Sequence, residues 1–412
     1  MKEKNICRCC KGKELLTYLN LGNQPLANSY HKGKKLPVYP LVVNLCTQCF
    51  HSQLSVVVNK ERMFKNYLYV SGTTDTFRNH TKKLAEDAIK RFDKKNLSVL
   101  DIACNDGTQL EYFRDFGCDV MGVDPAENLR SITKEKNINV VVDYWTEKVA
   151  DLIGKKFEII TGTNVFAHVN DLDQFLNASR IALKKNGLLI LEFPYADKMI
   201  EHNEFDTVYH EHLSYFLVNS FATLAKRKGF QIVDVLQTSI HGGSIRFFLK
   251  AGDDQHCDKV KKLIKEEEMK GLLSVGSYKQ FSQRVKKNKK NMIILIENLK
   301  KKNKTVVGYG ASAKGNTMLN YFKLKLDYIV DDNELKWGYK TPGRNIPIVS
   351  PSAIAEAKDE LHVVVLSWNF YNEIVRKVLT LKKKNVKVNF LLYVPDVKSI
   401  PGIKAGKISV SA

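Results

Sequence analysis

The sequence lacks the features that would place it in a membrane or outside the cell. Its N-terminus, Met1-Lys2-Glu3-Lys4-Asn5, is charged and has no apolar segment of the kind that a secretory signal requires. No apolar run approaches the length of a membrane span. We therefore expect a cytoplasmic protein that contacts no membrane. Because the cytosol keeps thiols reduced, the eight cysteines favour metal ligation over disulfides.

Acidic residues are outnumbered: 44 Asp and Glu face 65 Lys and Arg, which gives a formal net charge of +21. Such an excess suits a nucleic-acid partner, an anionic surface or an acidic small substrate. The alternative that we favour is a lysine-rich solvated surface, because the basic runs at 286–290, 300–304 and 382–384 resemble exposed helix faces or loops. With 412 residues and 44% hydrophobic content, the chain should divide into two or three domains.

Phosphate-binding glycine motifs are also missing. Residues 99–107 (Val-Leu-Asp-Ile-Ala-Cys-Asn-Asp-Gly) read as a strand and a turn, but only Gly107 is a glycine, with Ala103 and Asn105 where a G-x-G-x-x-G motif would have others. A nicotinamide cofactor is therefore disfavoured. The turn suits S-adenosylmethionine, which has no phosphate to bind.

Two carboxylates support this interpretation. Asp101 opens the turn, and Asp124 follows it by 23 residues in Met-Gly-Val-Asp-Pro, at the expected end of the next strand. A carboxylate there can accept hydrogen bonds from both ribose hydroxyls of an adenosine-containing cofactor. The competing interpretation is an ordinary strand–turn–helix unit.

We expect residues 1 to about 60 to form a short, strand-poor region. It buries too little apolar surface to be stable without a cross-link. Two C-x-x-C pairs supply one, because each can place two thiolates on a tetrahedral zinc. The pairs are Cys7 with Cys10 and Cys46 with Cys49, although Cys9 could replace Cys10. Four thiolates fill the coordination shell, so the zinc should be structural.

From about 75 to 250 the pattern is that of a doubly wound sheet. We expect helices at 76–92, 172–183 and 220–228, and strands at 99, 158–161, 188–193, 231–238 and 244–250. The last two face each other across His241-Gly242-Gly243 as a closing hairpin. By analogy between folds, that ending fits a class I methyltransferase better than a dehydrogenase.

A basic, helix-rich connector at 278–301 precedes a second α/β region. The strand 305–310 runs into the turn Ala311-Ser312-Ala313-Lys314-Gly315-Asn316, and further strands are expected at 327–330, 362–366 and 388–393. Backbone amides at such a turn could bind a phosphate with help from Lys314. A purely structural turn is the equal alternative, since the spacing is not that of a Walker loop.

The catalytic candidates lie in the loop Tyr209-His210-Glu211-His212, with Tyr215 close behind. This loop follows a strand that ends in Pro194 and Tyr195, and open α/β sheets bind ligands beyond their carboxyl ends. The cluster favours acid–base chemistry over a zinc site or packing histidines.

These motifs, in this order along the whole chain, are similar to those of the nucleotide-sugar C-methyltransferase family, whose best-known members methylate the third carbon of dTDP-4-keto-deoxysugars. The motifs that carry the resemblance are the two C-x-x-C pairs, Tyr67-Leu68-Tyr69-Val70-Ser71-Gly72-Thr73, Asn105-Asp106-Gly107, Tyr209-His210-Glu211-His212, His241-Gly242-Gly243-Ser244 and Gly308-Tyr309-Gly310-Ala311-Ser312-Ala313-Lys314-Gly315-Asn316.

The resemblance implies an α/β protein of three domains: a small zinc-binding domain (1–62), a class I, Rossmann-like methyltransferase domain (63–255) and a second Rossmann-like domain (256–412) that helps to bind the sugar nucleotide. It points to His212 as general base, with Tyr209, Glu211 and either Tyr67 or Tyr69 lining the sugar.

The chemistry agrees with these roles. A carbon beside a ketone becomes acidic because its carbanion delocalises as an enolate, and a base must reach that proton. The oxyanion needs donors, which His210, a tyrosine or His241 could provide. The residues expected at S-adenosylmethionine are Asp101, Ala103, Asn105, Gly107, Asp124, Pro125 and Asn164. Those expected at the substrate are Tyr195, His241, Ser244, Arg246, Ser312, Lys314 and Asn316.

Two other functions remain open at this point. One is a zinc-containing RNA methyltransferase or nucleic-acid-binding protein, which the charge would suit, although the basic runs lack interleaved aromatic residues. The other is an O-methyltransferase in which His212 deprotonates a hydroxyl. We expect a monomer that binds no nucleic acid.

Overall fold

The computed structural model describes residues 2–64 and 71–402, and its N-terminal part is richer in strands than expected. An antiparallel sheet has the order β11-β4-β3-β2. The strands are β2 (Leu15–Gln24), β3 (Tyr39–Cys46), β4 (Ser52–Leu54) and β11 (Ser214–Tyr215), while β1 (Lys2–Glu3) pairs with β5 (Val56–Val57) ahead of α1 (Glu61–Phe64). The strand-poor expectation is therefore wrong. The register of β2 against β3 shifts twice, which breaks the alternation that reveals a strand.

The central region forms a seven-stranded sheet in the order β12-β13-β10-β9-β6-β7-β8. Its strands are β6 (Ser98–Ile102), β7 (Asp119–Val123), β8 (Asn139–Val141), β9 (Phe157–Thr163), β10 (Leu183–Pro194), β12 (Phe230–Thr238) and β13 (Ser244–Ala251). Strands β6 to β10 are parallel, and β13 runs antiparallel to both β10 and β12. The expected closing hairpin is confirmed.

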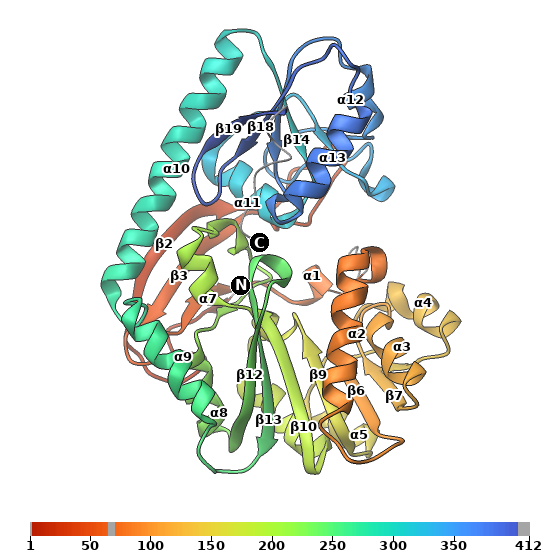
Figure 1. The fold of residues 1–412 in the computed structure, drawn as a ribbon. Helices are drawn as coiled ribbons and strands as arrows, with labels where there is room; N and C mark the ends of the chain where they lie inside the picture. Colours follow the sequence, from red (N-terminus) through yellow and green to blue (C-terminus); the bar gives the residue numbers. More distant parts are fainter. Residues whose placement is uncertain (1, 65–70, 403–412) are drawn as a thin grey trace.

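Helices cover both faces of this sheet (Figure 1). They are α2 (Asp75–Ile89), α3 (Thr108–Asp115), α4 (Arg130–Glu135), α5 (Glu147–Ile153), α6 (Leu172–Ala182), α8 (Val218–Arg227) and α9 (Asp258–Met269), while α7 (Ala196–Glu201) follows the carboxyl end of β10. On one face, buried Leu84 of α2 and Phe113 of α3 pack with Ile159 and Ile190 of the sheet. Burial of such side chains contributes about 1.5–3 kcal/mol each, so the apolar strands hold α2 and α3 in place.

The C-terminal region is a second open sheet, in the order β16-β15-β14-β17-β18-β19. Its elements are β14 (Thr305–Tyr309), α11 (Ala313–Phe322), β15 (Ile329–Val330), β16 (Ile348–Val349), α12 (Ser352–Glu356), β17 (Leu361–Val365), α13 (Tyr371–Leu381), β18 (Val388–Leu392) and β19 (Lys398–Pro401). All its pairings except β18 with β19 are parallel. The strand order reverses at β14, the place where such folds bind ligands. The expected α/β class with a second Rossmann-like unit is confirmed.

The long helix α10 (Val275–Lys301) runs along one side of the molecule and joins these regions (Figure 1). Tyr278 packs edge-on against Tyr18 of β2, with ring centroids 5.0 Å apart. Further along, Asn288 donates hydrogen bonds to the carbonyl oxygens of Tyr393 and Pro395 at 2.9 and 2.7 Å. The helix therefore fixes the C-terminal sheet relative to the N-terminal one.

The carboxyl ends of the two Rossmann-like sheets are turned toward one another. Trp368, after β17, donates a hydrogen bond to Asp206, which lies beyond β10 and α7, at 2.8 Å. Tyr393, after β18, donates to the same carboxylate oxygen at 2.6 Å. A Cβ on Gly242, in the β12–β13 connection, would lie 2.9 Å from the Trp368 ring. Ligands at either edge would thus share one interface.

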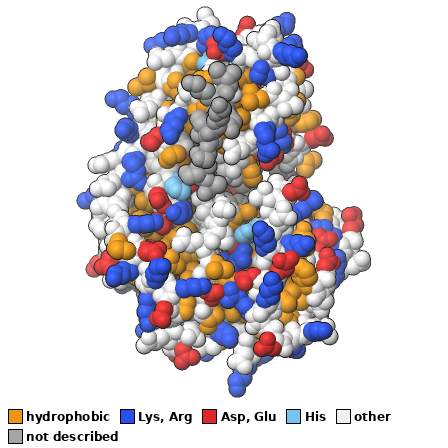
Figure 2. Space-filling model, in the orientation of Figure 1, with side chains coloured by type: hydrophobic (Ala, Val, Ile, Leu, Met, Phe, Trp, Pro, Cys, Tyr) orange, Lys and Arg blue, Asp and Glu red, His pale blue; other side chains and the backbone are white. Residues whose placement is uncertain are grey.

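Positive charge is dispersed over the face shown in Figure 2, where Lys and Arg side chains lie among acidic and apolar ones. Most residues of the basic runs 286–290, 300–304 and 382–384 are exposed on or beside helices. Within the described ranges, no helix has both the length and the apolar character needed to cross a bilayer.

Candidate functional site

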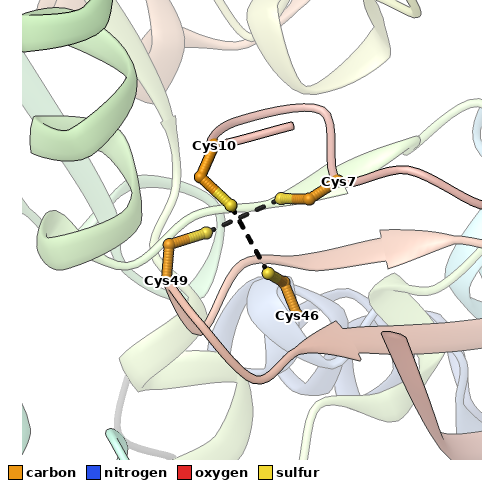
Figure 3. Close-up of side chains that lie close together, drawn as sticks. All are labelled: Cys7, Cys10, Cys46 and Cys49. Atoms are coloured by element: carbon orange, nitrogen blue, oxygen red, sulfur yellow. Dashed lines mark hydrogen bonds between the residues drawn. The ribbon is translucent and has the colours of Figure 1, made fainter. Parts of the chain in front are cut away.

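The four cysteines of the two C-x-x-C pairs meet at one point (Figure 3). Their sulfur atoms all lie within 4.8 Å of one another, with Cys7 3.6 Å from Cys49 and Cys10 3.5 Å from Cys46. Tetrahedral zinc with Zn–S bonds near 2.3 Å separates its sulfurs by about 3.8 Å, so the cluster fits zinc. Cys9 is buried outside the set, and its carbonyl accepts a hydrogen bond from Arg227. Cys10, and not Cys9, therefore completes the cluster that could hold the metal.

The turn after β6 is held by the carboxylate of Asp124. The Asn105 amide donates to its Oδ2 at 2.9 Å and the Ala126 amide to its Oδ1 at 2.8 Å. Ala103, Asn105 and Gly107 have φ values of 59°, 52° and 76°. Because Asn tolerates this left-handed region, the turn forms with one glycine. Each Asp124 oxygen keeps a lone pair that a ribose hydroxyl can use.

Two further polar groups lie near this turn. Asp101, 3% exposed, accepts hydrogen bonds from Gln109 at 3.0 Å and Thr161 at 2.6 Å, and burial raises its pKa to about 7. It therefore ties β6 to α3 and β9. Asn164 follows β9 with φ 57°, and its buried Oδ1 has no hydrogen-bond partner. A buried acceptor left open at this edge fits the donor groups of a bound S-adenosylmethionine. Pro125, next to Asp124, is partly buried.

The loop after α7 brings His212 into a defined state. Its Nδ1 lies 2.8 Å from the carbonyl oxygen of Thr207, and its Nε2 lies 2.7 Å from the Tyr209 hydroxyl. A carbonyl oxygen only accepts, so in neutral His212 the proton is on Nδ1 and the Nε2 lone pair accepts from Tyr209. His212 is 8% exposed. His212 is thus oriented with its basic nitrogen toward Tyr209.

His168 is a member of this cluster that sequence reasoning missed. Its ring centroid lies 4.8 Å from that of His212, in a T-shaped arrangement. Burial lowers the pKa of His168 to about 4, so it is neutral at pH 7. The sequence signal that could have identified His168 is its position shortly after the carboxyl end of β9, the strand next to β10 in the sheet.

The other two residues of the motif point toward the zinc-binding domain. His210 Nε2 lies 3.3 Å from the carbonyl oxygen of Tyr39 in β3, and burial lowers the pKa of His210 to about 4. Glu211, 3% exposed, accepts a hydrogen bond from the Asn28 side chain at 2.7 Å. The loop 209–212 is therefore packed against a domain that begins more than 150 residues earlier.

Arg246 belongs to a buried charged network at the end of β10. Its Nε donates to Glu192 at 2.8 Å, and His80 of α2 lies 2.6 Å from the other oxygen of that carboxylate. Burial alone would raise the pKa of Glu192, but the hydrogen bond from His80 and the charge of Arg246 hold it below its usual value. His80 and Glu192 were not expected at the site, since neither stands in a motif.

The turn after β14 repeats the arrangement found after β6. The Ala311 amide donates to Asp331, just past β15, at 2.6 Å, and Gly310 has φ 89°. Ser312 caps α11 by accepting from the Gly315 amide at 3.1 Å. The Nζ of Lys314 lies 4.2 Å from the centre of the Trp368 ring, and its charge acts on Glu204 and Asp206 of the central region.

Other residues expected at the substrate form bonds within the protein. The Tyr195 hydroxyl donates to Glu267 of α9 at 2.7 Å, and the Ser244 hydroxyl donates to the Ile240 carbonyl at 3.1 Å. The Asn316 amide donates to the Ala27 carbonyl at 2.8 Å. Tyr67, Tyr69 and the His241 side chain lie outside the described part of the structure.

Three families of domain match consecutive parts of this chain. They are a putative zinc binding domain at 7–64, a methyltransferase domain at 77–235 and a C-methyltransferase C-terminal domain at 239–395. The chain is 31% identical over 384 residues to the C-methyltransferase NovU of Streptomyces niveus, which covers 90% of this chain and 91% of that protein.

More distant similarities cover less. A ubiquinone biosynthesis O-methyltransferase of Bartonella tribocorum is 36% identical over 100 residues, which are 23% of this chain and 40% of that protein. The solved structure of magnesium protoporphyrin IX methyltransferase from Synechocystis, with bound SAM, is 15% identical, with a TM-score of 0.33 over 42% of this chain and 78% of that one. The full-length match and the three domain families, together with the thiolate cluster and the Asp124 turn, place the chain in the family of S-adenosylmethionine-dependent C-methyltransferases that includes NovU.

Proposed function

We propose that this C-methyltransferase acts on a nucleotide-linked 4-keto-deoxysugar, that His212 forms its enolate, and that the methyl group goes to carbon 3. The observation that carries the proposal is the 2.8 Å contact between Nδ1 of His212 and the carbonyl oxygen of Thr207. The Thr207 carbonyl holds the proton on Nδ1, so Nε2 carries the basic lone pair and can take a proton from carbon once the Tyr209 hydroxyl donates elsewhere. Because burial opposes charging of the neighbouring His168, a single imidazole in this cluster would carry the transferred proton.

Bound S-adenosylmethionine supplies an electrophilic methyl group on a sulfonium. The protein's own residues do the remaining work. Tyr209, whose hydroxyl now donates to Nε2, moves its hydrogen bond to the substrate oxygen where negative charge develops. His212 removes the proton beside the ketone and holds it on Nε2. Alignment of the two reactants by separate domains can lower the barrier by roughly 7–11 kcal/mol.

Lys314 and the turn after β14 support a site for the sugar nucleotide between the two sheets. Lys314 lies near buried Glu204 and Asp206. Burial raises the carboxyl pKa of both acids, and the positive charge of Lys314 partly offsets that increase. A cation beside these acids can bind a diphosphate without leaving the interface strongly positive. We place six further residues around this substrate: Ser312, Asn316, Arg246, Tyr195, Ser244 and His241. We also propose that the enzyme is a monomer whose three domains span residues 1–62, 63–255 and 256–412.

The test is product analysis with purified enzyme, S-adenosylmethionine and dTDP-, GDP- and CDP-linked 4-keto-6-deoxyhexoses. NMR should show a new C–C bond at carbon 3. A methyl ether would contradict the proposal, and a methyl at carbon 5 would correct the position alone. His212→Asn, which keeps the bond to Thr207, should abolish transfer while calorimetry shows unchanged S-adenosylmethionine binding. Near-normal turnover of that variant would exclude His212 as the base.

A further inference from the structure

One segment of the zinc-binding domain, residues 25–30 between β2 and β3, contacts both other domains. Asn28 donates to Glu211 of the catalytic loop at 2.7 Å. Tyr30 donates to the Ala311 carbonyl, in the turn after β14, at 2.6 Å. The Ala27 carbonyl accepts from Asn316 of α11 at 2.8 Å. We propose that this segment forms part of the active site and that Asn28 is the positioning residue for Glu211; this rests on the function proposed above.

The segment is built to hold Asn28 at a fixed place. Leu26 and Ala27, on one side, are 7% and 5% exposed, and Tyr30 is anchored on the other side by its hydroxyl. Asn28 itself is exposed, so its side chain contributes little to packing. Its side-chain amide donates to Glu211, while its backbone carbonyl accepts from the Tyr30 amide at 3.0 Å. An exposed amide that reaches from one domain to a buried carboxylate of another is better explained by the site than by stability.

The direction of the bond defines the state of Glu211. An amide N–H donates, so the Glu211 oxygen accepts and that carboxylate is fixed in one orientation. Burial and the charges of Asp331 and Glu211 raise the pKa of Tyr30, so its hydroxyl stays neutral and donates to the Ala311 carbonyl. His210 and His212 are the titratable neighbours of Glu211 along the chain. Removing the amide would take away a hydrogen bond that orients the Glu211 carboxylate next to the proposed base.

Two substitutions separate positioning from packing. Asn28→Ala removes the donor, and kcat on dTDP-4-keto-6-deoxyglucose should fall by about 10- to 100-fold, the cost of a misplaced active-site group. Asn28→Asp puts two carboxylates in contact, so they share one proton and the pair titrates at raised pKa. The protonated pair mimics Asn28, and its activity should approach that of wild type at acidic pH and fall as pH rises through the pair's pKa.

The matched control is Asn23→Ala, which changes an exposed asparagine of β2 in the same domain and should keep wild-type kcat at every pH. All three variants should keep their zinc content and their affinity for S-adenosylmethionine. Wild-type kcat in Asn28→Ala would overturn the positioning role.

A second readout does not depend on turnover. Carbon-13 NMR of the Glu211 carboxyl, assigned with Glu211→Gln, should show its pKa raised in Asn28→Ala, because a hydrogen bond to the charged form is lost. An unchanged Glu211 titration would overturn the contact itself. If wild-type protein converts none of the keto sugars, the proposed function fails, while this titration still decides whether Asn28 holds Glu211.

Discussion

At the scale of single residues, Asp124 is proposed to do two things with one carboxylate. Its oxygens accept the Asn105 and Ala126 amides and so shape the turn, and we propose that they also accept the ribose hydroxyls of the cofactor. Asp101, by contrast, accepts hydrogen bonds from two side chains of the protein, Gln109 of α3 and Thr161 of β9. Two acids that look alike in the sequence therefore differ in what they can offer a ligand.

Substitution of Asp124 by Ala should weaken S-adenosylmethionine binding by about 10- to 100-fold, because hydrogen bonds to a charged group contribute about 1.5–3 kcal/mol. Isothermal titration calorimetry measures this. The control is Asp119→Asn, which alters an exposed carboxylate at the opposite end of the same strand, β7, and should leave the affinity unchanged. Affinity within about twofold of wild type in Asp124→Ala would contradict the assignment.

Residues inside motifs were within reach of sequence reasoning, and isolated ones were not. The C-x-x-C spacing of the four cysteines predicts that they share one metal site, and the structure places their sulfur atoms within 4.8 Å of one another. His168, His80 and Glu192 stand alone in the sequence, and each becomes significant only through a partner from a distant element. Nothing local distinguishes Asn28 from Asn23, yet the Asn28 side chain is the one that donates to Glu211 in the loop 209–212.

At the scale of elements, the sheet of the zinc-binding domain includes a strand from a distant part of the chain. Strand β4 pairs with β11, which comes from the central region about 160 residues later. Long, regular elements such as α10 and the β12–β13 hairpin could be predicted because their periodicity is local. The strand β2 could not, because two register shifts disrupt its alternation and its sheet is completed from elsewhere.

Zinc should be structural and stoichiometric. Cys46→Ser should remove the metal, lower the thermal midpoint by more than about 5 °C and reduce activity through the segment 25–30. Elemental analysis and calorimetry measure the first two effects. Cys118→Ser, at a buried cysteine outside the cluster, is the control for loss of a thiol and should keep one zinc per chain. This role would be contradicted if Cys46→Ser had wild-type stability and the purified native protein contained no zinc.

At the scale of the whole molecule, the two sheets face one another with their carboxyl ends, and the loop that carries Asp206 and His212 lies at that junction. Helix α10 and the segment 25–30 fix the domains around it. The class of fold and the order of domains follow from the sequence, since each α/β region has its own pattern. Their relative placement does not, because it depends on single hydrogen bonds across long stretches of chain.

This placement gives the central claim, that an oriented imidazole removes a proton beside a ketone before the methyl group is transferred. The most direct test is proton NMR of dTDP-4-keto-6-deoxyglucose in heavy water with the enzyme and S-adenosylhomocysteine, which provides no methyl group. With wild-type protein the signal of the proton on carbon 3 should disappear faster than without enzyme, and with His212→Asn it should persist. Retention of that proton with wild-type enzyme, or equal loss with His212→Asn, would contradict the account.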